Sequence, residues 1–412
     1  MKDTIYQTIL MNNFLVERSP SPVNFRASSL VEQLPNHYFS SLHEKVAAYQ
    51  RKGIDVINLA NGHPDQPTPE EIVHTLQEAV ADKENQGYPS FYGKKSIREA
   101  IAAFYKREYA VELDPETEII VFQGSGVGIT GIPQSILNPG DYLLATDPAY
   151  PAYKVAATLA KANYFDIPVH ERDGFLPDYK VVPEEIAEKV KLLILNYPNN
   201  PTGALATPDF FKESIAFAEK YQFPILHDFA YGAFGFDGQK PISLLQVPGG
   251  KEYGIETYSA SKTFNMAGWR FGFAVGNASI IAAFKKFHSH SYSTVFGAIQ
   301  DAAITALLGP QDNVKRLREL YETRRNTLVG ALRNIGWDVP SPQGTFFAWF
   351  QVPTGFTSRT FAELLFEEAH IAVAPGEGFG EYGSSYIRIS LANSEERLLE
   401  AVERMAKLKI FQ

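Results

Sequence analysis

The pattern of apolar and polar positions divides the chain into three parts. Residues 1–30 are mixed in character and include the run from Ser19 to Pro22, which predicts a loosely held arm. From about residue 55, short apolar runs alternate with longer segments of helical periodicity. From about residue 308 the pattern changes: a long charged helical stretch, Val314–Ile335, precedes two short strands near Phe346–Phe350 and Tyr386–Leu391.

The apolar runs predict buried strands, and the periodic segments predict helices. We expect strands at Ile119–Phe122, Tyr142–Ala145, Leu192–Leu195, Pro224–Leu226, Thr257–Tyr258 and Phe271–Val275, and helices at Tyr38–Arg51, Thr130–Leu137 and Phe210–Tyr221. Strands that alternate with helices are typical of a mostly parallel sheet covered on both faces. The predicted fold class is therefore α/β, with an arm at residues 1–34, a large domain at 61–307, and a smaller α+β domain made of 35–60 and 308–412.

Composition narrows the classes of function. Of the 412 residues, 45% are hydrophobic and 21% are charged, which excludes a disordered chain. The net charge of −9 argues against a nucleic-acid partner, and the absence of cysteine excludes disulfides and thiolate metal sites. We find no metal-ligand constellation, no apolar run of membrane-spanning length and no basic leader, so we expect a cytoplasmic protein without membrane contact.

Four motifs follow predicted strands at their carboxyl ends, where ligands bind in α/β sheets. The first, Phe122–Gly128, is rich in glycine and opens a helix, so its backbone N–H groups could hold an anion. Its glycine spacing matches neither the phosphate loop of nucleoside triphosphatases nor the glycine motif of dinucleotide-binding proteins. The second, Asn196–Gly203, is a rigid turn with two prolines that could direct an asparagine toward a ligand. Both motifs could instead be plain turns.

The third and fourth motifs carry charge. Asp228 and Tyr231 follow a predicted strand, although an aspartate there could also cap a helix. Lys262 ends an apolar strand within Ser259-Ala260-Ser261-Lys262, where a charged amine is costly to bury. A neutral lysine can form a Schiff base with a carbonyl, whereas the alternative is an ordinary surface lysine. Arg270 and the two serines supply donors that suit a phosphate.

Together the motifs offer a phosphate cradle, a carboxylate, a lysine, an asparagine and a tyrosine hydroxyl, which is the donor set that pyridoxal 5'-phosphate requires. Over roughly residues 35–408 the chain resembles the fold-type I, class I/II aminotransferases. The matching residues are Asn200-Pro201-Thr202-Gly203, Asp228 with Tyr231, Ser259 with Ser261 and Lys262, Arg270 and Arg388. The stretches Asn196–Gly203, His227–Gly238 and Ser261–Gly276 are similar to the bacterial methionine-salvage transaminases, which aminate 2-oxo-4-methylthiobutanoate.

The resemblance implies the catalytic residues Lys262, Asp228 and Tyr231. Lys262 would bind the cofactor covalently and later carry the proton. Asp228 would accept a hydrogen bond from the protonated ring nitrogen and so keep the ring electron-withdrawing. Arg388 would bind the substrate carboxylate, with the backbone of Gly62 nearby.

The resemblance also implies the other cofactor contacts. They would come from Asn200 and Tyr231 at the ring hydroxyl, from Tyr150 stacked on the ring, and from Ser125, Gly126, Ser259, Ser261 and Arg270 at the phosphate. Many relatives carry a Lys or Gln side chain after the Ser/Gly pair of the phosphate loop, whereas Val127 stands here, so that contact would be made by the backbone alone. Tyr88 would reach the phosphate of a neighbouring subunit, which implies a homodimer with shared sites.

The sequence says less about which substrates the site binds. Relatives that act on dicarboxylates have an arginine in the region of Phe287–Gly297, and none is present here. We therefore expect a neutral or apolar pocket for at least one substrate, with Phe39, Tyr92, Tyr292 and Phe347 as candidate lining residues that could also be core. The expected reaction moves an amino group between an L-amino acid and a 2-oxo acid, with methionine as one candidate and aromatic, branched-chain or alanine specificity open. A carbon–sulfur β-lyase is the alternative enzyme; a non-catalytic regulator fits the short N-terminal segment and the acidic charge poorly.

Overall fold

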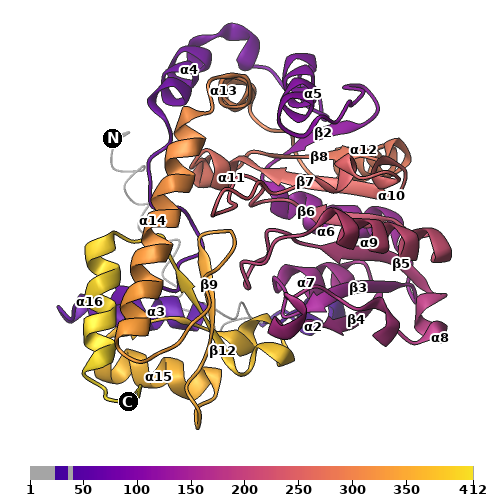
Figure 1. Cartoon of the computed structure of the whole chain (residues 1–412). Helices are drawn as coiled ribbons and strands as arrows, with labels where there is room; N and C mark the ends of the chain where they lie inside the picture. Colours follow the sequence, from indigo (N-terminus) through magenta and orange to yellow (C-terminus); the bar gives the residue numbers. More distant parts are fainter. Residues whose placement is uncertain (1–23, 36–39, 412) are drawn as a thin grey trace, which may run out of the picture. The chain divides into compact units, whose positions relative to one another are not determined.

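The computed structural model describes residues 24–35 and 40–411 (Figure 1). The chain divides into two units, Met1–Pro35 and Asn36–Gln412. The described part of the first unit contains a short helix, α2 (Ser29–Gln33), which begins where the Val31 N–H donates to the Ser28 hydroxyl. Phe39, one of the predicted substrate contacts, lies outside the described residues.

A seven-stranded sheet forms the larger core of the second unit. Its strands lie in the order β2-β8-β7-β6-β5-β3-β4, and β8 runs antiparallel to both of its neighbours while the other pairs are parallel. The strands are β2 (Ile119–Phe122), β3 (Tyr142–Asp147), β4 (Asn163–Pro168), β5 (Val190–Leu195), β6 (Ile225–Asp228), β7 (Gly254–Ser259) and β8 (Gly272–Gly276). The predicted α/β class with a mostly parallel sheet is confirmed.

Helices cover both faces of this sheet. Successive residues of β2 alternate between two clusters: Ile119 and Val121 pack with residues of α5 and α13, whereas Ile120 and Phe122 pack with residues of α6 and α12. Because both faces are buried, the strands are almost continuously apolar. The helices of this part are α4 (Glu70–Ala81), α5 (Lys95–Tyr109), α6 (Ser125–Ile136), α7 (Ala152–Leu159), α8 (Glu184–Ala187), α9 (Pro208–Tyr221), α10 (Gly250–Tyr253), α11 (Ala260–Thr263), α12 (Ala278–Ser291) and α13 (Gly297–Leu308).

A second, smaller core is built mainly from the C-terminal part of the chain. Its antiparallel sheet has the order β11-β12-β9, with β9 at Phe347–Gln351, β11 at Ala374–Pro375 and β12 at Tyr386–Ser390. The helices α14 (Asp312–Asn334), α15 (Ser358–Ala369) and α16 (Glu395–Ala406) pack around it (Figure 1). The earlier segment α3 (Ser40–Arg51) joins this core through Tyr49 and Phe366, whose ring centroids are 4.8 Å apart, and β1 (Ile57–Asn58) pairs with β10 (Ile371–Ala372).

The sheet register brings the predicted site residues to one edge. The parallel neighbours β5, β6 and β7 all end on the same side, and Asp228 at the end of β6 stands opposite Thr257 of β7. Arg388, on β12 of the smaller core, is hydrogen-bonded to Asn200 in the turn after β5. The two cores therefore meet at this edge. Within residues 24–35 and 40–411, no helix combines the length and apolar character that crossing a membrane requires.

Candidate active site

Lys262 lies on α11, a four-residue helix that follows β7 directly. The Ser261 N–H donates to the hydroxyl of Ser259, the last residue of β7, and this bond starts the helix. One turn later the Lys262 ammonium donates to the Gly62 carbonyl over 2.8 Å. Gly62 is 200 residues away along the chain, so the fold holds the amine at the junction between distant segments.

The charges around Lys262 favour its neutral form. Burial, together with the positive charges of Arg388 and Arg270, lowers the pKa of Lys262 to about 8, and Asp228 opposes this shift. An amine with such a pKa is neutral often enough near neutrality to act as a nucleophile and a base. The same arginines and Asp228 also act on the pKa of Tyr150, so all five groups share one electrostatic environment.

Asp228 is the last residue of β6 and is buried. Its Oδ2 accepts a hydrogen bond from the Tyr153 hydroxyl at 2.9 Å, and its main-chain carbonyl accepts one from Asn196 Nδ2 at 2.7 Å. Among the described residues, its Oδ1 has no hydrogen-bond partner. Burial raises the pKa of Asp228, while the Tyr153 hydrogen bond, the charge of His227, a hydrogen bond from the Ala230 N–H and the charge of Lys262 oppose that rise. The missing partner is therefore a donor, and a cationic one would stabilise the carboxylate most.

Arg388 is buried where the smaller core meets the turn after β5. Its Nη1 donates to Asn200 Oδ1 at 2.9 Å, and its Nη2 donates to the Ala60 carbonyl at 3.1 Å. The guanidinium carbon lies 4.0 Å from the ring centroid of Phe347 and 4.8 Å from that of Phe379. Burial lowers the pKa of Arg388 to about 10. A carboxylate bound beside it would restore the lost solvation of this cation.

The start of α6 offers an anion site made largely of backbone. No side chain caps this helix, and the preceding residue, Gly124, has φ +84°. A β-carbon on Gly124 would lie 2.8 Å from the Arg270 guanidinium carbon, so glycine allows the arginine to approach the helix end. A β-carbon on Gly126 would meet nothing within 4 Å. N–H groups and one cation thus face an open space, which suits a phosphate.

The three predicted tyrosines lie in different surroundings. Tyr231 is buried, with its ring centroid 5.8 Å from that of Phe347. Tyr150 is partly exposed and contacts Tyr153 edge-on, with centroids 5.8 Å apart. Tyr88 is 99% exposed, so its own chain covers almost none of it. The structure therefore places Tyr231 beside Phe347 and Tyr150 beside Tyr153, and it leaves Tyr88 exposed on its own chain.

Comparisons with known proteins identify the family of the chain. The profile of the family described as aminotransferase class I and II matches residues 54–405. The chain belongs to this family. The L-glutamine–4-(methylsulfanyl)-2-oxobutanoate aminotransferase of Bacillus subtilis is 52% identical over 389 residues, which cover 94% of this chain and 98% of that enzyme. The LL-diaminopimelate aminotransferase of Halothermothrix orenii is 44% identical over 375 residues, 91% of this chain and 96% of that enzyme.

Solved structures of aminotransferases have the same fold as this chain. The substrate-bound structure of BacF from Bacillus subtilis has a TM-score of 0.91 and 43% identity, covering 94% of this chain and 99% of that one. An aspartate aminotransferase mutant from Thermus thermophilus has a TM-score of 0.87 at 29% identity, covering 93% of this chain and 100% of that one. The chain is thus a pyridoxal-phosphate-dependent aminotransferase, as the motifs predicted, and nothing in these comparisons favours the β-lyase.

The site of this aminotransferase fits pyridoxal phosphate at three points. Asp228 Oδ1 lacks a donor, which a protonated pyridine nitrogen would supply. Lys262 has the lowered pKa that a Schiff-base lysine needs. The start of α6, together with Arg270, offers donors for the phosphate.

Several groups of the aminotransferase site were missed by sequence reasoning. Tyr153 holds Asp228, and Asn196 links the main chain of Asp228 to Asn200, whose N–H donates to Asn196 Oδ1 at 2.8 Å. Tyr153 lies three residues after Tyr150, a spacing that could have pointed to it. Asn196 opens the turn Asn196–Gly203, in which Asn200 is the predicted ligand contact.

Of the aromatic residues predicted to line the substrate pocket, the structure places only some beside Arg388. Phe347 lies against Arg388, as a substrate contact would. Tyr292 stacks on His288 with centroids 5.6 Å apart, and the Lys285 ammonium lies 5.4 Å from the Tyr92 ring centroid. These contacts connect Tyr92 and Tyr292 with α12, so their role toward a substrate stays a prediction.

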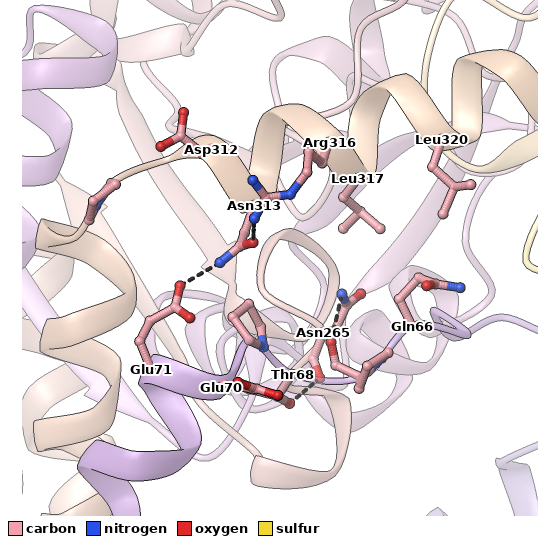
Figure 2. Close-up of a pocket in the computed structure, with 13 residues that line it drawn as sticks. Gln66, Thr68, Glu70, Glu71, Asn265, Asp312, Asn313, Arg316, Leu317 and Leu320 are labelled. Atoms are coloured by element: carbon pink, nitrogen blue, oxygen red, sulfur yellow. Dashed lines mark hydrogen bonds between the residues drawn. The ribbon is translucent and has the colours of Figure 1, made fainter.

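A separate pocket of about 690 Å³ lies between the segment before α4 and the start of α14 (Figure 2). Its wall includes Asn265, whose Nδ2 donates to the Pro67 carbonyl at 3.2 Å and whose own carbonyl accepts from the Thr68 hydroxyl at 2.7 Å. None of the predicted cofactor or substrate residues lines it. Within the described part of the chain, no group of three or more His, Asp or Glu could hold a metal ion.

Proposed function

We propose that this aminotransferase interconverts methionine and 2-oxo-4-methylthiobutanoate, with a neutral amino acid such as glutamine as the other amino partner. The relative that is 52% identical is named for amino transfer from glutamine to this oxo acid. The lack of an arginine in Phe287–Gly297 also favours a side-chain pocket without a second carboxylate. The identity to that enzyme over nearly its whole length is the observation that carries the proposal.

We propose the following division of labour among the residues of the site. When bound, pyridoxal phosphate supplies an electron sink that makes the α-proton of the substrate removable. Lys262 Nζ, whose pKa of about 8 leaves a fraction of it neutral near neutral pH, takes that proton and returns it. Asp228, whose Oδ1 has no partner among the described residues, would hold the ring nitrogen, while Tyr153 fixes the other carboxylate oxygen. The donors at the start of α6 and Arg270 bind the phosphate.

The substrate carboxylate is assigned to Arg388. Asn200 Oδ1 and the Ala60 carbonyl accept hydrogen bonds from its two terminal nitrogens and so fix the plane of the guanidinium. A carboxylate held in one orientation fixes the bonds at the α-carbon as well, which selects proton loss over decarboxylation. Gly62, whose carbonyl accepts from Lys262, keeps the base close to this position.

A panel of amino donors and 2-oxo acids tests the substrate assignment. We expect the highest kcat/KM with glutamine or methionine as donor and 2-oxo-4-methylthiobutanoate as acceptor. Aspartate and glutamate should be at least about tenfold poorer, because their side-chain carboxylate would be buried without a partner. A preference for LL-diaminopimelate would overturn the methionine assignment but not amino transfer. Release of ammonia, thiol and pyruvate from cystathionine without an acceptor would favour the lyase.

We also propose that the enzyme is a cytoplasmic homodimer, that Tyr88 of one subunit completes the site of the other, and that the two cores are its large and small domains. The nearly complete exposure of Tyr88 supports a role outside its own chain. Tyr88→Phe should weaken cofactor binding while sedimentation still shows a dimer. A fully active monomer would contradict the shared site.

A further inference from the structure

A buried ion pair lies next to Asp228 and has no part in the division of labour above. His227 of β6 and Glu256 of β7 stand opposite each other in the parallel sheet, and neither is exposed. His227 Nδ1 lies 2.7 Å from Glu256 Oε2. Two aromatic rings, Phe211 and Phe229, pack against the imidazole with centroids 5.1 and 4.9 Å away, so water is kept from it.

The hydrogen bonds indicate the charge of each member. His227 Nε2 lies 2.9 Å from the Tyr197 carbonyl oxygen, which can only accept, so Nε2 carries a hydrogen. Glu256 accepts from the Tyr105 hydroxyl at 2.7 Å, the Ser243 hydroxyl at 3.0 Å and the Leu244 N–H at 3.1 Å. Three donors other than the histidine converge on this carboxyl, which is the environment of an ionised carboxylate. Nδ1 therefore donates as well, and His227 is an imidazolium.

Burying such an ion pair in a core costs desolvation free energy. Apolar residues of the same size would often stabilise the fold as well or better, because both charges must leave water. A buried charged pair with every donor and acceptor satisfied does, however, impose one fixed arrangement on the groups that it joins. The groups joined here belong to the site.

His227 connects the two strand ends that carry Asp228 and Asn200. Through Nε2 it holds the Tyr197 carbonyl in the turn after β5. The same turn is tied to the main chain of Asp228 by Asn196, which also accepts from the Asn200 N–H. Because His227 and Asp228 are consecutive, the positive charge of the imidazolium also acts on the Asp228 carboxylate.

We propose that His227, held by Glu256, is a positioning residue of this aminotransferase: its imidazolium keeps Asp228 ionised and fixes the turn that presents Asn200. The proposal rests on the roles given above to Asp228 and Asn200. The charged and titratable groups around it are Glu256 of β7, Asp228 of β6 itself and Tyr105 of α5. The charge of Glu256 also acts on Tyr109 of α5 and Tyr258 of β7.

Two nuclear magnetic resonance measurements on the full-length, cofactor-free enzyme test it. The first observes the ring nitrogens of His227 near neutral pH, with His227→Gln used for assignment. Two N–H signals are expected. One N–H signal would mean a neutral ring beside a protonated Glu256 and would overturn the proposal without any substitution having been made.

The second measurement follows the Asp228 carboxyl carbon as the pH is varied, assigned with Asp228→Asn. In the double variant His227→Gln/Glu256→Gln an amide pair replaces the ion pair, and the midpoint for Asp228 should rise by roughly 0.5 to 1 pH unit because a positive charge that acts on Asp228 is gone. Tyr105→Phe is the matched control: it removes a donor to Glu256 but no charge of the pair, and the midpoint should stay in place. If the double variant does not fold, His227→Gln alone serves, because it removes the cation and leaves the Glu256 carboxyl, and a rise in the same direction is expected.

An unchanged Asp228 midpoint in the folded charge-free variant would overturn the proposal, since a merely structural pair would alter stability and leave the carboxyl alone. The loaded enzyme gives a second readout. The double variant should bind pyridoxal phosphate more weakly, and Tyr105→Phe should not. Failure of the proposed function would look different, because it would appear in the panel of donors and 2-oxo acids as a preference for other substrates, while the Asp228 midpoint would still shift in the double variant.

Discussion

The two ends of the proposed site differ in the groups that form them. The ring end has buried side chains, including Asp228 and Arg388, and the phosphate end has backbone N–H groups and Arg270. At the ring end charged side chains are buried: Asp228 is 6% exposed and Arg388 5%. At the phosphate end the donors are N–H groups at the start of α6 and the exposed Arg270. Charges in a dry interior interact strongly, whereas exposed charges are screened by water and salt. The ring end should therefore control the reaction, and the phosphate end should control how well the cofactor is retained.

The strongest test of this contrast is Lys262→Ala. We expect turnover to fall by at least about 10⁴-fold and the visible absorbance of the bound cofactor to disappear, because the covalent link and the proton carrier are lost together. Absorbance spectra and single-turnover assays measure both. Lys285→Ala is a matched control, since burial also lowers the pKa of Lys285 but it lies on α12 beside Tyr92. A Lys262 variant with near-normal turnover would refute the assignment.

Arg388→Ala should come second. Loss of a charge-assisted contact of about 1.5–3 kcal/mol predicts a KM for the amino acid that is about 10- to 150-fold higher, with the cofactor still bound. Arg388→Lys should recover only part of the loss, because an ammonium cannot make the paired contacts of a guanidinium. Steady-state kinetics with the cofactor spectrum recorded in parallel provide the measurement. An unaltered KM would mean that another group binds the carboxylate.

The core strands of the fold were predictable for a physical reason. β2 was expected at Ile119–Phe122 and lies there, because it is buried on both faces and all four of its residues are apolar. The edge strand β4, Asn163–Pro168, has half-exposed and polar positions, so its pattern gives no such signal. The helix expected from Thr130 begins at Ser125. Glycine lowers helix propensity in that first turn, and packing against the sheet outweighs it.

The site was predictable to the extent that it follows the strand ends. Asp228 and Lys262 stand directly after β-strand runs in the sequence, and parallel neighbours must bring such residues together. Their supporting partners depend on which residues stand opposite across the sheet or on a helix far along the chain. Tyr153 is 75 residues from Asp228, and Glu256 is 29 residues from His227. No local pattern in one sequence specifies these pairs, and the register supplies them.

Arg270→Ala probes the phosphate end and should have a different kind of effect. We expect cofactor affinity to fall about 10- to 100-fold through loss of one charge-assisted contact, while the N–H groups of α6 remain. With excess cofactor, kcat should return close to its original value. Equilibrium dialysis gives the affinity, and kinetics at saturating cofactor give kcat. A kcat that stays low at saturation would erase the distinction between the two ends.

The smallest expected effect concerns Asp147, at the end of β3 three residues before Tyr150. It accepts hydrogen bonds from the N–H groups of Glu381 at 2.9 Å and Tyr382 at 3.2 Å, and so links the strand end to the smaller core. Burial, followed by the nearby Asp166, raises the pKa of Asp147 from 3.8 to about 6. The titration of Asp147 therefore tests whether this junction between β3 and the smaller core is shielded from solvent, as the buried residues Asp228 and Arg388 are.

The sign of the Asp147 effect follows from its raised pKa. Between about pH 4 and 6 the folded chain keeps a proton on Asp147 that the unfolded chain has released, so this contribution to stability is complete below about pH 4 and is lost as the pH rises through about 6. Its size is at most about 3 kcal/mol. Urea unfolding of the wild type and of Asp166→Asn across this range measures it. Removing the Asp166 charge should lower the Asp147 pKa and shrink the pH-dependent loss, whereas identical pH profiles would show that solvent screens Asp147 as it screens the phosphate end.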